Sequence, residues 1–170
     1  QKQNFTEGWL GCSLYQEIIS DDLDGAPPPI DLKTEKQIIE TIMTLNNNKL
    51  LTGAHDISDG GLLTATCEML FKNRLGLNVN LPKALMSSNS KDHLLHSWCF
   101  GEDQNRIIIS TNEPDKVVSL LKESLIDYYI LGITNTSSNL NFNEVDTISI
   151  KDIYNINERT IPSLMDTYKS

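Results

Sequence analysis

The sequence predicts an α+β domain in which helices pack against a layered, mixed β-sheet. Two observations support this fold class. Segments with helix-like and strand-like apolar spacing follow one another in an irregular order along the chain. The length of 170 residues also suits one domain that is large enough to bury a real core. The order of the strands in the sheet cannot be derived from the pattern.

The helices are predicted from apolar stripes and from capping residues. Asp31 is a good N-cap for a helix over about residues 32–48, in which Ile38, Ile42 and Leu45 recur at helical spacing. Pro114 suits the first turn of another helix, because that position needs no backbone N–H. That helix is expected at about 112–125, and the remaining helical segments at about 62–71, 151–156 and 160–168.

The strands are predicted from short apolar or alternating runs. Residues 50–54 are expected to form a short buried strand, and the unbroken run from Ile107 to Ile109 is typical of a central strand buried on both faces. Apolar and polar residues alternate over 77–81, which indicates a half-buried strand. Further strands are expected near 129–134, 140–143 and 147–150.

Charge and composition exclude several classes of function. The net charge is −9 with 14 scattered cationic residues, which argues against binding to nucleic acid. No apolar stretch approaches the ~20 residues needed to span a bilayer, and no signal segment is visible, so a cytoplasmic protein is expected. The three cysteines form no Cys-Xaa-Xaa-Cys pair, which makes disulfide scaffolding and zinc binding poor interpretations.

Two histidines stand three residues apart, at His93 and His96. This spacing could present both rings to one metal ion, but two ligands without a third make a poor site. The surrounding stretch, residues 87–97, is polar, and we expect it to be a surface loop. No metal site is predicted here.

Residues 54–63, Ala-His-Asp-Ile-Ser-Asp-Gly-Gly-Leu-Leu, are the most informative stretch and are called the signature below. They combine polar groups with a glycine pair immediately before an apolar, helix-like run. At a helix N-terminus, glycines leave backbone N–H groups open, and the helix dipole favours a bound phosphate or a metal-bound phosphate oxygen. The alternative is an ordinary turn with a Ser58 or Asp59 cap, and the pattern alone does not decide between the two.

The signature resembles the His-Asp-Xaa-Ser-Asp-Gly-Gly-Leu motif of the formylglycinamide ribonucleotide amidotransferases, also called phosphoribosylformylglycinamidine synthases. Residues 100–106, Phe-Gly-Glu-Asp-Gln-Asn-Arg, are similar to a second motif of that family, and together these two segments are the specific part of the match. Three less specific segments agree in order, at residues 10–15, 27–32 and 148–165. Cys12 departs from the family, which usually has glycine at that position, and a position with positive φ would strain it.

The resemblance implies a fold like the C-terminal domain of aminoimidazole ribonucleotide synthetase. Residues 1–170 would be a single C-terminal lobe of a larger multidomain synthetase. That enzyme belongs to purine biosynthesis and is an ATP-dependent ligase. It converts formylglycinamide ribonucleotide, glutamine and ATP into formylglycinamidine ribonucleotide, ADP, phosphate and glutamate.

The resemblance also implies ligands and partners. The full-length enzyme uses ATP and Mg²⁺, and its partners are the remaining lobes, a glutaminase and a small bridging subunit. Its principal catalytic histidine lies in an absent lobe, so no catalytic residue is assigned here and the isolated chain is expected to be inactive. The candidate ligand-binding residues are His55, Asp56, Ser58, Asp59, Gly60 and Gly61. Asp56 and Asp59 would lie near Mg²⁺ without binding it directly, and the glycine amides would face phosphate.

Two other functions remain open. The lobe could be a non-catalytic interaction module that docks the glutaminase or the bridging subunit. It could also belong to another ATP-dependent synthetase or kinase of the same superfamily, although residues 100–104 favour the amidotransferase.

A salt bridge that fixes a loop is the preferred interpretation of the charged residues Glu102, Asp103 and Arg106. The expected pair is Glu102 with Arg106.

Overall fold

In this computed structural model the described residues are 8–21, 24–83, 85, 91–142 and 146–167. They divide into two compact units. Unit 1 comprises residues up to Thr66 together with Pro82–Ile130, and unit 2 comprises Cys67–Leu81 together with the residues from Leu131 onward. Each unit is described by itself.

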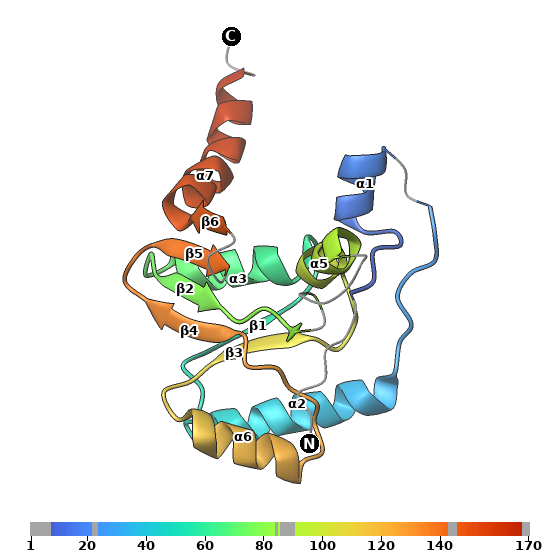
Figure 1. The fold of residues 1–170 in the computed structure, drawn as a ribbon, viewed down its shortest axis with the longest axis vertical. Helices are drawn as coiled ribbons and strands as arrows, with labels where there is room; N and C mark the ends of the chain where they lie inside the picture. Colours follow the sequence, from blue (N-terminus) through green and yellow to red (C-terminus); the bar gives the residue numbers. More distant parts are fainter. Residues whose placement is uncertain (1–7, 22–23, 84, 86–90, 143–145, 168–170) are drawn as a thin grey trace. The chain divides into compact units, whose positions relative to one another are not determined.

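Unit 1 contains a two-stranded antiparallel sheet with helices on one side of it. Strand β1 (Gly53–Asp56) pairs with β3 (Ile107–Ser110), and Figure 1 shows α2 (Leu32–Asn47) and α6 (Pro114–Glu123) along the same side of these strands. Leu45, Val117 and Leu121 form the centre of the core, and Ile109 of β3 packs against them. The unit also holds α1 (Leu14–Ser20), α5 (Lys91–Phe100) and the first residues of α3 (Gly61–Phe71).

Unit 2 contains a four-stranded mixed sheet in the order β4-β2-β5-β6. Strands β2 and β5 are parallel, whereas β2–β4 and β5–β6 are antiparallel. The strand bounds are Gly76–Val79 for β2, Gly132–Asn135 for β4, Asn139–Phe142 for β5 and Asp146–Ser149 for β6. The end of α3 and the helix α7 (Ile150–Thr167) complete the unit.

The two faces of this sheet differ in polarity because successive side chains of a strand point to opposite sides. Leu77, Val79, Leu140 and Phe142 are buried. On the other face the Asn78 Oδ1 accepts hydrogen bonds from the amide groups of Asn135 and Asn141, at 3.1 and 2.9 Å. The predicted fold class, α+β with a mixed sheet and packed helices, is confirmed.

Several sequence-based boundaries are confirmed. Asp31 caps α2 by accepting the N–H groups of Lys33 and Thr34, and Pro114 begins α6. The buried strand expected at 50–54 begins three residues later, at Gly53, because Leu50 and Leu51 pack against the core between α2 and α6 instead of pairing in the sheet. It is also not buried, since its residues alternate between half-buried and exposed.

Other expectations were wrong. Of the surface loop expected at 87–97, residues 91–97 belong to the helix α5, and residues 87–90 lie outside the described residues. The two helical segments expected after residue 150 are one helix that continues through Pro162, and α1 was not predicted. Helix α6 ends at Glu123, before Leu125, which has a φ of 56° and is exposed. Among the described residues β3 pairs only with β1, and its residues are all partly exposed, so it is not a central strand buried on both faces.

Helix α3 buries a thiol that should make the stability depend on pH. Burial raises the pKa of Cys67 to about 11 from its usual 9.0, and the neighbouring Glu68 carboxylate acts in the same direction. The unfolded chain therefore loses this proton first, so the stabilisation by the neutral thiol is complete below pH 9 and is lost as the pH rises towards 11. We expect the free energy of unfolding, measured in urea, to fall over that window and Cys67→Ala to reduce the fall. If the free energy of unfolding fell equally with pH in the wild type and in Cys67→Ala, the raised pKa of Cys67 would be contradicted.

Candidate functional site

The segment Phe100–Arg106, called the hub below, connects α5 to β3 and is the centre of the candidate site. The N–H of Gly101 donates to the Ser97 carbonyl at 2.9 Å, which ends α5. Asn105 has a φ of 65°, so the chain reverses there before β3 begins. The side chains of this short loop are thereby turned towards three segments that are distant in the sequence.

Glu102 joins two of these segments through a single carboxylate oxygen. Its Oε1 accepts the backbone N–H of Gly60 at 2.8 Å and that of Leu14, the first residue of α1, at 3.0 Å. The Glu102 N–H in turn donates to the carbonyl of Trp9 at 2.9 Å. The signature and the start of α1 are therefore held by the same group.

Asp103 and Arg106 form the ion pair of the hub. The Asp103 Oδ1 accepts the Trp9 N–H at 3.0 Å, and its Oδ2 accepts from the Arg106 guanidinium, which also donates to the carbonyl of Gly101. The Arg106 and Asp103 side chains are only 17% and 21% exposed. The expected salt bridge thus exists, but the prediction that Glu102 is the partner of Arg106 was wrong. Glu102 binds backbone N–H groups instead.

Asn105 brings a fourth segment to the hub. Its side-chain amide donates to the carbonyl of Asp31, at 3.2 Å, where the proline-rich stretch 27–32 ends and α2 begins. All four of the segments around 10–15, 27–32, 54–63 and 100–106 therefore meet at one place. Sequence reasoning matched these segments one by one and did not predict that the hub contacts the other three.

The signature begins on β1 and ends in the first turn of α3. The Ile57 N–H donates to the Arg106 carbonyl at 3.0 Å, which continues the pairing of β1 with β3. Gly60 and Gly61 then adopt φ values of 79° and 72°, a region in which residues with side chains are strained. A Cβ atom at Gly61 would lie 2.5 Å from the carbonyl carbon of Phe100, so this glycine permits the signature to pack closely on the hub.

The two glycine amides are not open to a ligand in this structure, contrary to expectation. The Gly60 N–H is taken by Glu102, and the Gly61 N–H donates to the carbonyl of Ser58 at 3.0 Å. Both glycines are buried, whereas Asp56, Ser58 and Asp59 are exposed. His55 is half-buried, and its Nδ1 lies 2.5 Å from the carbonyl oxygen of Asp56. The groups that a ligand could reach are therefore side chains rather than amides.

Metal binding and membrane insertion find no support in the described parts of the chain. No three His, Cys, Asp or Glu side chains come together there in a way that could hold a metal ion. His96 of α5 lies instead with its Nδ1 2.6 Å from the Tyr15 hydroxyl. Within the same described ranges, no helix combines the length and apolar character required to cross a membrane.

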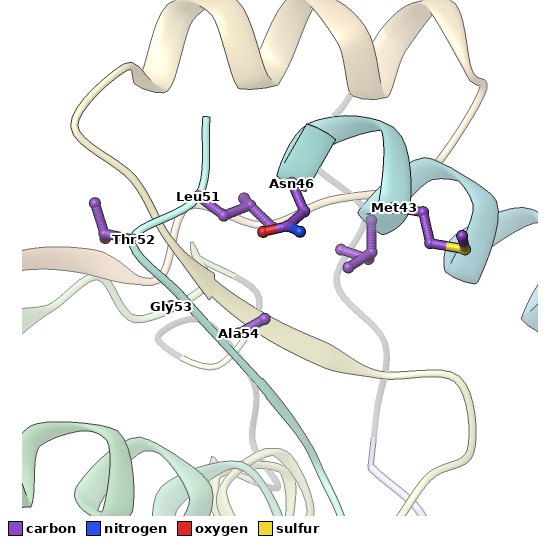
Figure 2. Close-up of a pocket in the computed structure, with 7 residues that line it drawn as sticks. Met43, Asn46, Leu51, Thr52, Gly53 and Ala54 are labelled. Carbon is purple, nitrogen blue, oxygen red and sulfur yellow. The ribbon is translucent and has the colours of Figure 1, made fainter. Parts of the chain in front are cut away.

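A separate pocket of about 300 Å³ lies between the end of α2 and the start of β1 (Figure 2). Asn46 and Thr52 are its only polar side chains among the described residues, and none of the lining side chains is ionisable. The pocket therefore offers volume but no acid, base or nucleophile. The lining residues are Ile42, Met43, Asn46, Leu51, Thr52, Gly53 and Ala54.

Cys12 occupies a strained position, as expected from its departure from the family. Its φ is 55°, and its thiol donates to the carbonyl of Gly25 at 3.2 Å. We predict that Cys12→Gly is more stable than Cys12→Ala by ~0.5–1 kcal/mol, because glycine relieves the strain while both variants lose the thiol. Thermal unfolding of the two variants measures this difference. Equal stabilities would show that the left-handed backbone costs little at residue 12.

The sequence is similar to a known protein family. Residues 6–143 match the family described as AIR synthase related protein, C-terminal domain. The phosphoribosylformylglycinamidine synthase subunit PurL of Rhodopseudomonas palustris strain TIE-1 is 32% identical over 162 residues, which is 94% of this chain and 21% of that protein.

Two solved structures from Thermotoga maritima share the fold. Phosphoribosylformylglycinamidine synthase II superposes with a TM-score of 0.61 and 18% identity, over 85% of this chain and 24% of the other. PurL complexed with FGAR gives a TM-score of 0.57 and 20% identity, over 71% and 21% of the two chains. This chain spans about a fifth of the length of the R. palustris relative. From the match over residues 6–143, the chain belongs to the family of AIR synthase related proteins as one of its C-terminal domains.

Proposed function

We propose that the chain is the C-terminal lobe of an ATP-dependent phosphoribosylformylglycinamidine synthase of the cytosol. The observation that supports this most strongly is the meeting of the signature with the hub, since both of the specific motifs lie in one contact network. The similarity to PurL of R. palustris over 94% of the chain supports the same assignment. Formylglycinamide ribonucleotide and ATP are then the substrates of the parent enzyme.

The proposed reaction replaces an amide oxygen by nitrogen. That oxygen is a poor leaving group, so the γ-phosphoryl group of ATP is transferred to it first, and ammonia released from glutamine then displaces phosphate. Mg²⁺, when bound in the parent enzyme, offsets the charge on the transferring phosphoryl group. The described residues of this chain fit a supporting role, because no three of their His, Cys, Asp or Glu side chains come together in a way that could hold the ion.

Within that enzyme the signature would contribute exposed side chains to the binding of the substrate or of Mg²⁺-bound phosphate. Asp56, Ser58 and Asp59 are exposed, and His55 is half-buried. Gly60 and Gly61 would act through position, since an added Cβ atom would meet the Thr64 side chain at Gly60 and the backbone of Phe100 at Gly61. Positioning is the main contribution that a protein makes to phosphoryl transfer.

The test uses the full-length parent enzyme with Asp56→Asn, Ser58→Ala and Asp59→Asn. In at least one of these variants, we expect KM for formylglycinamide ribonucleotide or for ATP to rise about tenfold. A change of this size corresponds to the loss of one hydrogen bond to a charged group. Glu123→Gln on the exposed end of α6 is the control and should leave KM unchanged. Normal kinetics in all three variants would remove the signature from the binding site. Amidine synthesis by the isolated chain would instead overturn the proposal that it is an accessory lobe.

A second candidate function is an interaction lobe for the glutaminase, the bridging subunit or another part of the synthetase. Large apolar side chains on α1 support it, because Ile18 and Ile19 are 70% and 66% exposed. In this case Ile18→Ser in the parent enzyme should weaken assembly with the glutaminase while ammonia-dependent activity persists. Unchanged assembly would favour the substrate-facing role of the signature.

A further inference from the structure

We propose that Glu102 is a positioning residue whose carboxylate is the resident anion of the signature turn. It occupies the place at the start of α3 where the glycine-rich sequence would otherwise receive a phosphate oxygen. The Gly60 N–H reaches Glu102 Oε1 at 2.8 Å. A hydrogen bond between a backbone N–H and an ionised carboxylate is stronger than one between neutral groups, so a dissolved phosphate must compete with a tethered partner.

The same oxygen makes Glu102 a link between two elements. Oε1 also accepts the N–H of Leu14, at 3.0 Å, so the first turn of α1 and the signature share one acceptor. Ser13 caps α1 through its side chain by accepting the Gln16 N–H, which leaves Leu14 to Glu102. Displacing the carboxylate would therefore release Gly60 and Leu14 together.

The backbone of Glu102 is fixed independently of its side chain. The Glu102 N–H donates to the carbonyl of Trp9. The carboxylate of the next residue, Asp103, accepts from the Trp9 N–H and from the Arg106 guanidinium. Removing only the carboxylate should thus leave the hub in place and vacate the anion position. Glu102→Gln keeps a neutral acceptor at this position, whereas Glu102→Ala leaves none. The two variants separate the effect of charge from that of the hydrogen bond.

The experiment follows the amide signals of Gly60 and Leu14 by ¹⁵N NMR in the 170-residue chain, during titration with inorganic phosphate. In the wild type we expect neither signal to move. In Glu102→Ala we expect hydrogen exchange of both amides to accelerate together by about tenfold or more, and phosphate to shift the Gly60 signal. Glu102→Gln should give a smaller acceleration, again at both amides. Gln104→Ala, an exposed neighbour in the hub, is the control and should match the wild type.

Two results would overturn the proposal. One is a phosphate-induced shift of Gly60 in the wild type at the same concentration as in Glu102→Ala. The other is acceleration at only one of the two amides in Glu102→Gln, which stays informative even if Glu102→Ala does not fold. Both amides report on the shared carboxylate whether or not the parent enzyme makes formylglycinamidine ribonucleotide, so this test is independent of the proposed function.

Discussion

Gly61→Val should destabilise the chain by about 3–5 kcal/mol, the largest effect of any substitution considered for the signature. Two costs combine at this position. A β-branched residue is strained at a φ of 72°. Its Cβ would also lie 2.5 Å from the carbonyl carbon and 2.7 Å from the Cα of Phe100, which is backbone and cannot rotate away. Either α3 or the hub must move.

Urea denaturation of the 170-residue chain measures this loss. Ala54→Val is a matched control, because Ala54 is exposed in β1 and β-branched residues suit strands. It should change the free energy of unfolding by less than ~1 kcal/mol. If Gly61 served only to leave the start of α3 open to a ligand, Gly61→Val would keep its fold and would mainly impair ligand binding. A stable Gly61→Val protein would restore that interpretation and contradict the close packing on Phe100.

Arg106→Ala should cost about 2–3 kcal/mol, the second largest effect. The substitution leaves the Asp103 carboxylate, 21% exposed, without its ionic partner and removes a donor from the Gly101 carbonyl. Lys116→Ala breaks an ion pair of the same i,i+3 spacing, with Glu113, but those side chains are 65% and 52% exposed. Exposed pairs contribute ~0–1 kcal/mol, so this control should be nearly neutral.

A double-mutant cycle separates the ion pair from the packing of the Arg106 side chain. If the pair carries the effect, Asp103→Ala and Arg106→Ala should be less than additive, with a coupling energy of about 1 kcal/mol or more. Full additivity would contradict the assignment of Asp103 as the partner of Arg106. In that case the loss in Arg106→Ala would come from its contact with Gly101.

Local signals in the sequence were sufficient for most elements. The Asp31 cap and the stripe of α2 predicted that helix to within one residue, because both are properties of neighbouring residues. The helix α5 was missed because its polar residues, among them His93 and His96, resemble those of a loop when the packing partner is unknown. His96 contacts Tyr15, which lies 81 residues away and cannot be seen in the local pattern.

The candidate site was only partly predictable for the same reason. The glycines and acidic residues of the signature pointed to this turn, and the motif at 100–106 pointed to the loop that contacts it, but ligand binding by the signature stays a prediction. The side chain that joins them is that of Glu102, which accepts from the Gly60 N–H across 42 positions of sequence. A glycine pattern indicates that no side chain covers the backbone N–H groups, but it does not indicate which acceptor forms hydrogen bonds with them. Here the acceptor is part of the chain.

The contacts of the hub should join the signature to the segment from Trp9 to Leu14 as one cooperative unit. Native-state hydrogen exchange of the Trp9, Leu14 and Gly60 amides tests it most directly, since each donates to the hub in the structure. We predict that the three amides exchange with a common free energy of opening and that Arg106→Ala lowers all three together. Protection of Trp9 while Gly60 exchanges at the rate of an unstructured peptide would contradict the claim.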